Sequence, residues 1–289
     1  MRYGLYVPNF GGFAEARLLA ELAHEAEEAG WDGFFLWDHV APHGRTSAVD
    51  PWVALTAMAM RTRRLRIGTM VTPLPRRRPW KLARETVSLD HLSQGRLVLG
   101  VGLGSGRPSE WDAFGEATEP RVRASMLDEA LQVLVGLWSG EPFSFEGRHY
   151  RVDESQFVPT PLQSPRIPIW VAGYWPHRAP LRRAARWDGC FPLFLPHGAP
   201  DDVELLAQAV SVLRAERTSD APFDVVKNAG PGTPEDRSAR AELVARYAEA
   251  GATWWVDTLV PEVFDGDWGA GWPGDLMRAR IREGPPRFD

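Results

Sequence analysis

Asp38 and His39 place an acid beside an imidazole, directly after the apolar run Phe34–Leu36 in the segment GWDGFFLWDHV. A short run that is apolar on both faces is typical of a strand in a parallel sheet. The carboxyl ends of such strands are where α/β proteins place their chemistry. Imidazole has an unperturbed pKa near neutral pH, which suits a group that gives and takes protons. We therefore predict that Asp38 and His39 serve chemistry and not packing.

The sequence lacks the patterns of several other kinds of chemistry. No pair of histidines has the spacing of a zinc site, and no CxxC is present, so no metal site is expected. There is no GxSxG elbow and no P-loop. The segments that follow the apolar runs are instead rich in glycine and aromatic residues. Such a setting suits a large planar cofactor that brings its own chemistry, while the protein supplies position and electrostatics.

Short apolar runs alternate with helical periodicity along the chain. Eight strand–helix units in 289 residues predict an α/β fold, a (β/α)8 TIM barrel, as one domain over residues 1–289. A doubly wound sheet is the alternative, but no GxGxxG turn follows the first strand. An insertion is expected around residues 138–166, with the hairpin-like run SFEGRHYRV. Thr233 is predicted to cap a helix over Pro234–Ala250. The expected strands are Tyr3–Val7, Phe34–Leu36, Leu65–Thr69, Leu97–Val101, Ile167–Val171, Gly189–Leu193, Phe223–Val226 and Thr253–Leu259.

Composition narrows the class of partner. The net charge of -5 and the pI near 5.9 argue against a nucleic-acid partner, which calls for a basic face. The single cysteine, Cys190, allows no internal disulfide, and no signal peptide or membrane span is evident. We therefore expect a cytoplasmic protein with a small-molecule substrate.

Six ordered segments resemble the luciferase-like flavin enzymes, which include FMN-dependent monooxygenases and coenzyme-F420-dependent oxidoreductases. Three of them are GWDGFFLWDHV, IGTMVTPLPRRRPWKLARETVSLDHLSQGRLVLGVGLGS and SEWDAFG; the others are LDEALQVLVGLWSGEPFSFEGRHYRV, PRIPIWVAGYWP and AGPGTPED. The resemblance covers nearly the whole chain. It implies a barrel with insertions, often a homodimer, that binds a reduced flavin or deazaflavin supplied by a separate reductase or F420 pool. FMN and F420 both remain open, with a lean towards F420.

The resemblance also assigns roles to residues. His39 matches a catalytic position as a proton donor or acceptor or as a stabiliser of a flavin–oxygen adduct, with Asp38 beside it. Glu110 matches a position used as an acid, and the basic run Arg76–Arg78 is a place for an anionic tail. A cis peptide bond between residues of non-proline type is expected at Thr69–Met70. The loop after the fifth strand would take the cofactor phosphate, although Tyr174 and Trp175 are larger than the family's usual residues there. The implied cofactor-binding set is Asp38, His39, Thr69, Met70, Thr72, Gly102, Gly173, Tyr174, Trp175 and Arg178.

Two other functions are kept in view. A barrel that binds flavin without turnover would follow if Tyr174 and Trp175 filled the pocket. A metal-dependent hydrolase using Asp38, His39 and Glu110 is less favoured, because those residues lack clustered ligand spacing.

Overall fold

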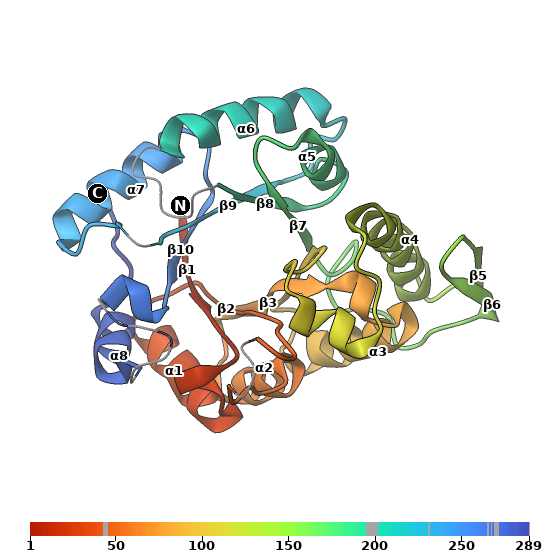
Figure 1. Ribbon diagram of the computed structural model, residues 1–289, viewed down its shortest axis with the longest axis horizontal. Coiled ribbons are helices and arrows are strands. Elements are labelled where there is room, and N and C mark those ends of the chain that lie inside the picture. The colour runs from red at the N-terminus through yellow and green to blue at the C-terminus, as the bar shows by residue number, and fades with distance from the viewer. Residues whose placement is uncertain are drawn as a thin grey trace.

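The computed structural model describes residues 1–42, 46–194, 202–230, 232–264, 266, 268 and 272–288. Its central feature is a closed barrel of parallel strands in the order β1-β10-β9-β8-β7-β4-β3-β2, seen down its axis in Figure 1. The predicted barrel is therefore confirmed. The strands are β1 (Arg2–Val7), β2 (Gly33–Leu36), β3 (Arg66–Pro73), β4 (Leu97–Gly102), β7 (Ile169–Tyr174), β8 (Gly189–Leu193), β9 (Asp224–Asn228) and β10 (Trp254–Thr258).

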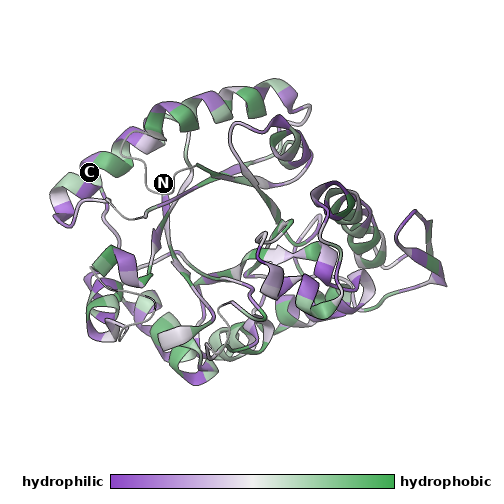
Figure 2. Ribbon diagram, viewed as in Figure 1, coloured by the Kyte–Doolittle hydropathy of each residue, from purple (hydrophilic) through white to green (hydrophobic). Residues whose placement is uncertain are grey.

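Helices surround the barrel and cover its outer face (Figure 1). Their apolar stripes pack on the strands, and Figure 2 shows that the outer helices carry both hydrophobic and hydrophilic residues. They are α1 (Ala16–Glu28), α2 (Pro51–Arg61), α3 (Pro79–Leu92), α4 (Pro120–Trp138), α5 (Arg178–Ala184), α6 (Asp202–Glu216), α7 (Arg237–Glu249) and α8 (Gly274–Glu283). No described helix is long and apolar enough to cross a membrane.

The start of α7 corrects one prediction. The helix begins at Arg237, and its N-cap is Asp236, whose carboxylate accepts from the Ala239 amide. Thr233 instead closes a turn with both backbone groups of Gly230. Both residue types satisfy exposed amides in this way, so sequence alone did not decide which of the two would cap the helix.

The core has two parts, divided by the barrel wall. The larger lies between strands and helices and includes Leu5, Phe34 and Leu36. The smaller fills the inside of the barrel with Phe35, Met70, Val98, Trp170, Phe191, Val226, Trp254 and Val256. Side chains alternate along a strand between the barrel interior and the helices. Once one residue of a strand is assigned to the inner or the outer core, the direction of the residues that follow it is therefore known.

The predicted insertion contains a two-stranded antiparallel hairpin, β5 (Phe143–Glu146) and β6 (Arg151–Ser155), which lies beside α4 away from the barrel (Figure 1). Glu129 of α4 accepts from the amides of Arg148, His149 and Tyr150 in the turn. The ring of Phe143 lies over Gly136 of the same helix, where a Cβ would stand 2.1 Å from it. The hairpin is therefore fastened to α4 and not to the barrel mouth.

Candidate active site

Asp38 and Glu110 meet at one arginine at the carboxyl ends of the strands. Arg76 lies in the short helical turn Leu74–Arg76 that follows β3. Its guanidinium lies 2.5 Å from Glu110 Oε2 and donates to the backbone and side chain of Asp38 at 2.9 and 3.3 Å. Arg77 adds two bonds to Asp38 at 2.7 and 2.8 Å. The four side chains form one ion network, in which Asp38, Glu110 and Arg76 are almost completely buried.

His39 lies at the edge of this network. Its Nδ1 is 3.5 Å from Glu110 Oε1, and its ring keeps some solvent exposure. The fully buried Asn9 fixes the backbone of His39: Oδ1 accepts from the His39 amide, and Nδ2 donates to the His39 carbonyl. Asn9 also donates to the Val49 carbonyl. The loops after β1 and β2 are thus joined through one amide side chain.

The ionisation of Glu110 follows from its surroundings. Burial alone would raise the pKa of this carboxyl, but the contacts with His39 and Arg76 and the bond from the Ala41 amide outweigh burial and lower it to about 2. Glu110 is therefore a carboxylate at neutral pH. Its role as an acid stays a prediction, and a carboxyl with this pKa carries no proton to donate near neutrality.

The strand β3 runs on to Pro73, so the predicted segment Thr69–Thr72 lies within it, and it differs from expectation in one bond. The cis peptide lies between Met70 and Val71, not between Thr69 and Met70. Along this stretch the pairing with β4 shifts register between Thr69 and Thr72, and sequence gives no signal for which bond turns. Thr69 and Thr72 are fully buried and bond to each other at 2.8 Å, while Met70 fills the barrel interior. Val71 and Gly102 are in contact range at the mouth. The cofactor contacts predicted for Thr69, Met70 and Thr72 stay a prediction.

Gly173 and Tyr174 are the last residues of β7, and Trp175 follows the strand; packing explains several of these residues. A Cβ on Gly173 would lie 2.0 Å from Pro180 of α5, so glycine permits the close packing of helix and strand. The Trp175 amide donates to the Leu193 carbonyl, and Trp175 packs against the outer core. Tyr174 remains 40% exposed. The first-turn amides of α5 at Arg178 and Ala179 have no intrahelical partner by geometry. Phosphate binding here stays a prediction.

Aromatic side chains form a wall beside His39, which sequence reasoning did not assemble. Phe10 meets the His39 ring edge-on at 5.5 Å, and Trp37 lies 5.6 Å from it. Tyr6 contacts Trp37 at 5.3 Å, and Phe10 stacks on Trp268 at 5.2 Å.

Trp272 packs on Phe10 and on the turn at Gly11, where a Cβ would lie 2.0 Å from the indole. The clustering of aromatics after the first and second strands was the available signal.

Several buried polar atoms have no hydrogen-bond partner among the described residues, and they include Trp37 Nε1, His39 Nδ1, Ser105 Oγ and Thr258 Oγ1. Val71, Ala172 and Leu193 form the partly buried apolar top of the barrel interior. Unpaired buried donors are costly and call for a partner. Apolar side chains at the top of the barrel interior, together with buried polar atoms that lack a partner, are compatible with a flavin or deazaflavin ring.

The family model for luciferase-like monooxygenases matches residues 1–275. The chain belongs to this family. An uncharacterised protein of Mycobacterium tuberculosis is 32% identical over 224 residues, which are 71% of this chain and 74% of that protein. An F420-dependent glucose-6-phosphate dehydrogenase of Nakamurella multipartita is 36% identical over 173 residues, 58% of this chain. The luciferase-like chain spans about half the length of that dehydrogenase, since 49% of it is matched.

Solved structures agree with the luciferase-like barrel. An F420-dependent secondary alcohol dehydrogenase, solved with an F420-acetone adduct, superposes with a TM-score of 0.77 over 100% of this chain and 99% of the other, at 18% identity. The monooxygenase RslO1 of Streptomyces bottropensis superposes with a TM-score of 0.65 at 25% identity, covering 98% of this chain and 84% of that one.

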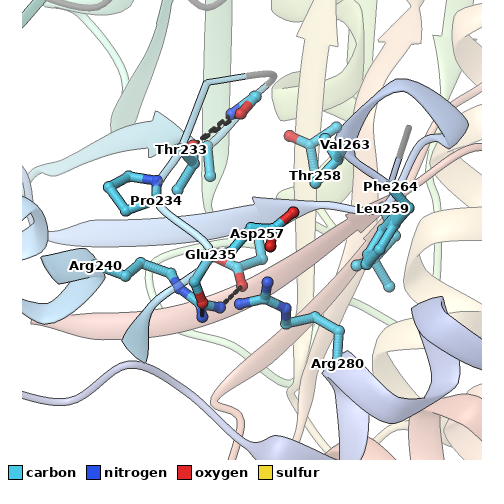
Figure 3. A pocket seen from close by; sticks show the side chains of 12 residues that line it. Thr233, Pro234, Glu235, Arg240, Asp257, Thr258, Leu259, Val263, Phe264 and Arg280 are labelled. Carbon is cyan, nitrogen blue, oxygen red and sulfur yellow. Dashed lines mark hydrogen bonds and ion pairs between the residues drawn. The ribbon is translucent and has the colours of Figure 1, made fainter. Parts of the chain in front are cut away.

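A separate small cavity of the luciferase-like chain lies outside the barrel wall, between the start of α7 and the end of α8 (Figure 3). Asp257 stands at its centre, with Arg240 and Arg280 close by. Burial raises the pKa of Asp257 to about 6, although Trp255 Nε1 donates to it and Arg240 lies 3.8 Å away. Asp257 points away from the barrel axis, because its neighbour Val256 faces inward. The Asp257 carboxylate therefore does not face the barrel interior, although its neighbour Thr258 also lines the cavity.

Proposed function

We propose that the protein is an oxidoreductase that exchanges a hydride between coenzyme F420 and a small organic substrate. The observation that carries the proposal is the buried network of Arg76, Asp38 and Glu110, which holds His39 at the barrel mouth. Hydride exchange at a carbon that bears oxygen requires a proton to move at that oxygen. His39 is placed to move it.

The geometry assigns parts to the two ring nitrogens of His39. Nδ1 is turned towards Glu110 Oε1, so Nε2 is the nitrogen that exchanges a proton with substrate. The Glu110 carboxylate faces the Nδ1 side of the ring, and Asn9 keeps the His39 backbone in place. Arg76 keeps Glu110 ionised and positioned. Asp38 acts through the two arginines and does not contact substrate.

A bound F420 or FMN would supply the redox chemistry, as a hydride carrier or by activating oxygen. Its ring would rest on Val71, Gly102 and Ala172. Its phosphate would lie near Arg178 at the start of α5. The basic run contributes little to this, because Arg76 and Arg77 are already paired with Asp38 and Glu110.

The relatives support F420 over FMN without deciding between them. Matches at 36% identity over 173 and 174 residues are named as F420-dependent dehydrogenases of glucose 6-phosphate and of hydroxymycolic acid. RslO1, at 25% identity, is named as a monooxygenase. An FMN-dependent monooxygenase is therefore the second candidate.

The test is a fluorescence titration of the purified protein with FMN and with F420, each oxidised and reduced. Preferential binding of F420 is expected, and binding of FMN alone would replace the proposal with the monooxygenase. Binding of neither would reject both candidates. His39→Gln should then keep cofactor affinity within about threefold, while turnover falls by roughly 10²–10⁴-fold, the usual size of a lost general acid or base. Unchanged turnover in this variant would remove His39 from the mechanism.

A further inference from the structure

We propose that the small cavity between α7 and α8 binds a halide ion such as chloride, which joins the end of β10 to both helices. The cavity is lined by the loop after β9, by the end of β10 and by one arginine from each helix (Figure 3). It does not include His39 or the ion network around Arg76, so this site is independent of the proposed function.

Arg240 of α7 is a buried guanidinium that leaves most of its N–H groups unused. The residue is only 1% exposed. Its Nη2 donates to the Glu235 carbonyl at 2.7 Å, and its Nε has no partner among the described residues. The carboxylates of Asp257 and Glu283 lie 3.8 and 3.7 Å from it, beyond hydrogen-bonding distance. A buried charge without hydrogen bonds is costly, so Arg240 calls for an acceptor in the cavity.

Arg280 of α8 brings a second positive charge to the same place. Figure 3 shows its guanidinium pointing towards that of Arg240. The side chain makes no hydrogen bond to another described residue, and Glu283 lies 3.6 Å from it. Arg237 lies 3.5 Å from the same carboxylate, so three guanidinium groups share Glu283. Two like charges that face each other favour an anion between them.

The size of the cavity selects a small anion. Its volume is about 20 Å³, which is room for a water-sized particle and too little for a phosphate group. A water molecule must donate hydrogen bonds as well as accept them, whereas a halide ion only accepts. Arg240 and Arg280 have donors and no acceptor, so the space between them suits a halide ion better than water.

The carboxyl of Asp257 makes the binding depend on pH. Burial raises its pKa to about 6. Below that pH the carboxyl is protonated and uncharged, and the positive charge of the arginines is left for the anion; above it, the carboxylate repels an anion. Binding should therefore be tighter at pH 5 than at pH 8. The groups that face Asp257 or line the same cavity are Trp255, which donates to it, Arg240, Arg280, Glu283 and Glu235.

Thermal unfolding with bromide as the probe tests the site in solution. As sodium bromide replaces sodium gluconate at constant ionic strength, the melting temperature of the unaltered protein should rise and then saturate, because a bound ion stabilises only the folded state. Gluconate is too large for the cavity. The half-maximal bromide concentration should be lower at pH 5 than at pH 8. A melting temperature without a saturating rise at either pH would overturn the proposal.

Anomalous scattering from crystals soaked in bromide would locate the ion. A peak is expected between the guanidinium groups of Arg240 and Arg280. No peak there would mean that water fills the cavity, and the proposal would fail. A peak in the crystal without any shift in solution would mean binding at crystal concentration only, which also rejects the site.

Three variants separate this site from other anion effects. Arg280→Gln removes one of the two facing charges, so the half-maximal bromide concentration should rise about tenfold or more, the cost of one hydrogen bond to an ion. Arg282→Gln is the matched control, because Arg282 lies on the same helix but pairs with Glu25. Asp257→Asn should bind bromide at pH 8 as tightly as the parent protein does at pH 5. An unchanged bromide response in Arg280→Gln would show that the ion binds elsewhere.

Discussion

Arg76 lies 2.5 Å from Glu110, and with its second terminal nitrogen it holds Asp38. The loops after β2, β3 and β4 are consequently joined through one guanidinium, whose planar fork suits two carboxylates at once. His39 depends on all three loops, because its nearest charged neighbour is Glu110 and its preceding residue is Asp38. The arrangement of the site therefore depends on several loops at the carboxyl end of the barrel and not on a single loop.

Glu110→Gln should change stability in acid. The folded pKa of about 2 is lower than the ordinary value of 4.5. The ionised carboxylate thus stabilises the fold above pH 4.5, and this contribution is lost as the pH falls through about 2. A shift of this size corresponds to about 3 kcal/mol.

Urea unfolding between pH 2 and pH 7 measures this. The glutamine variant should be less stable at pH 7 and lose less on acidification, while Glu242→Gln, at an exposed position on α7, should follow the parent protein. Parallel curves for Glu110→Gln and the parent would contradict the network.

Asn9→Asp should destabilise the protein, although the two side chains have nearly the same shape. The carboxylate keeps an acceptor for the His39 amide but faces the His39 and Val49 carbonyls, to which Nδ2 now donates. We expect a loss of about 2–4 kcal/mol of unfolding free energy, since two buried acceptors lose their donor beside a new charge. Turnover should fall together with that of His39 variants. Thermal unfolding and kcat measured on the same preparation check both effects, and full activity in a folded variant would remove Asn9 from the positioning of His39.

Asp257→Asn should act in the opposite pH direction from Glu110. Because burial raises the folded pKa to about 6 from 3.8, the neutral form is favoured in the fold. Stability from this group is complete below pH 3.8 and is lost as the pH rises through 6, by about 3 kcal/mol. Asparagine cannot ionise, so the variant should lack this decline. Chemical denaturation from pH 4 to 7 tests it, with exposed Asp153→Asn as the control; an unaltered slope in Asp257→Asn would mean that the carboxyl titrates normally.

Gly173→Ala tests whether glycine is needed for packing. The new methyl would stand 2.0 Å from Pro180, so β7 and α5 must separate. A cost of about 1–3 kcal/mol is expected for such overpacking. Gly106→Ala is the matched control, because nothing lies within 4 Å of its Cβ position. If Gly173→Ala keeps its melting temperature but loses cofactor affinity, then the glycine serves a ligand and not the helix.

The barrel was predictable because parallel strands buried on both faces leave apolar runs, and eight of these recur in 289 residues. Asp38 and His39 were found for the same reason, as polar residues directly after such a run. Asn9 was missed as a site residue, and Arg76 was expected to attract an anionic tail rather than to pair with Glu110. Their contacts cross 30 and 34 residues, respectively, through loops without a periodic pattern. The cis bond was misplaced by one residue because Thr69, Met70 and Val71 offer no local signal for it.

The hydrogen bonds between Glu129 and the hairpin turn have a consequence for amide hydrogen exchange. Three successive amides, those of Arg148, His149 and Tyr150, are bonded to one carboxylate on α4, although the turn lies away from the barrel. Their deuterium uptake should follow the opening of α4 and stay slower than an ordinary exposed turn allows. The deuterium uptake of these three amides would therefore measure the local opening of α4, at a turn that lies away from the barrel mouth.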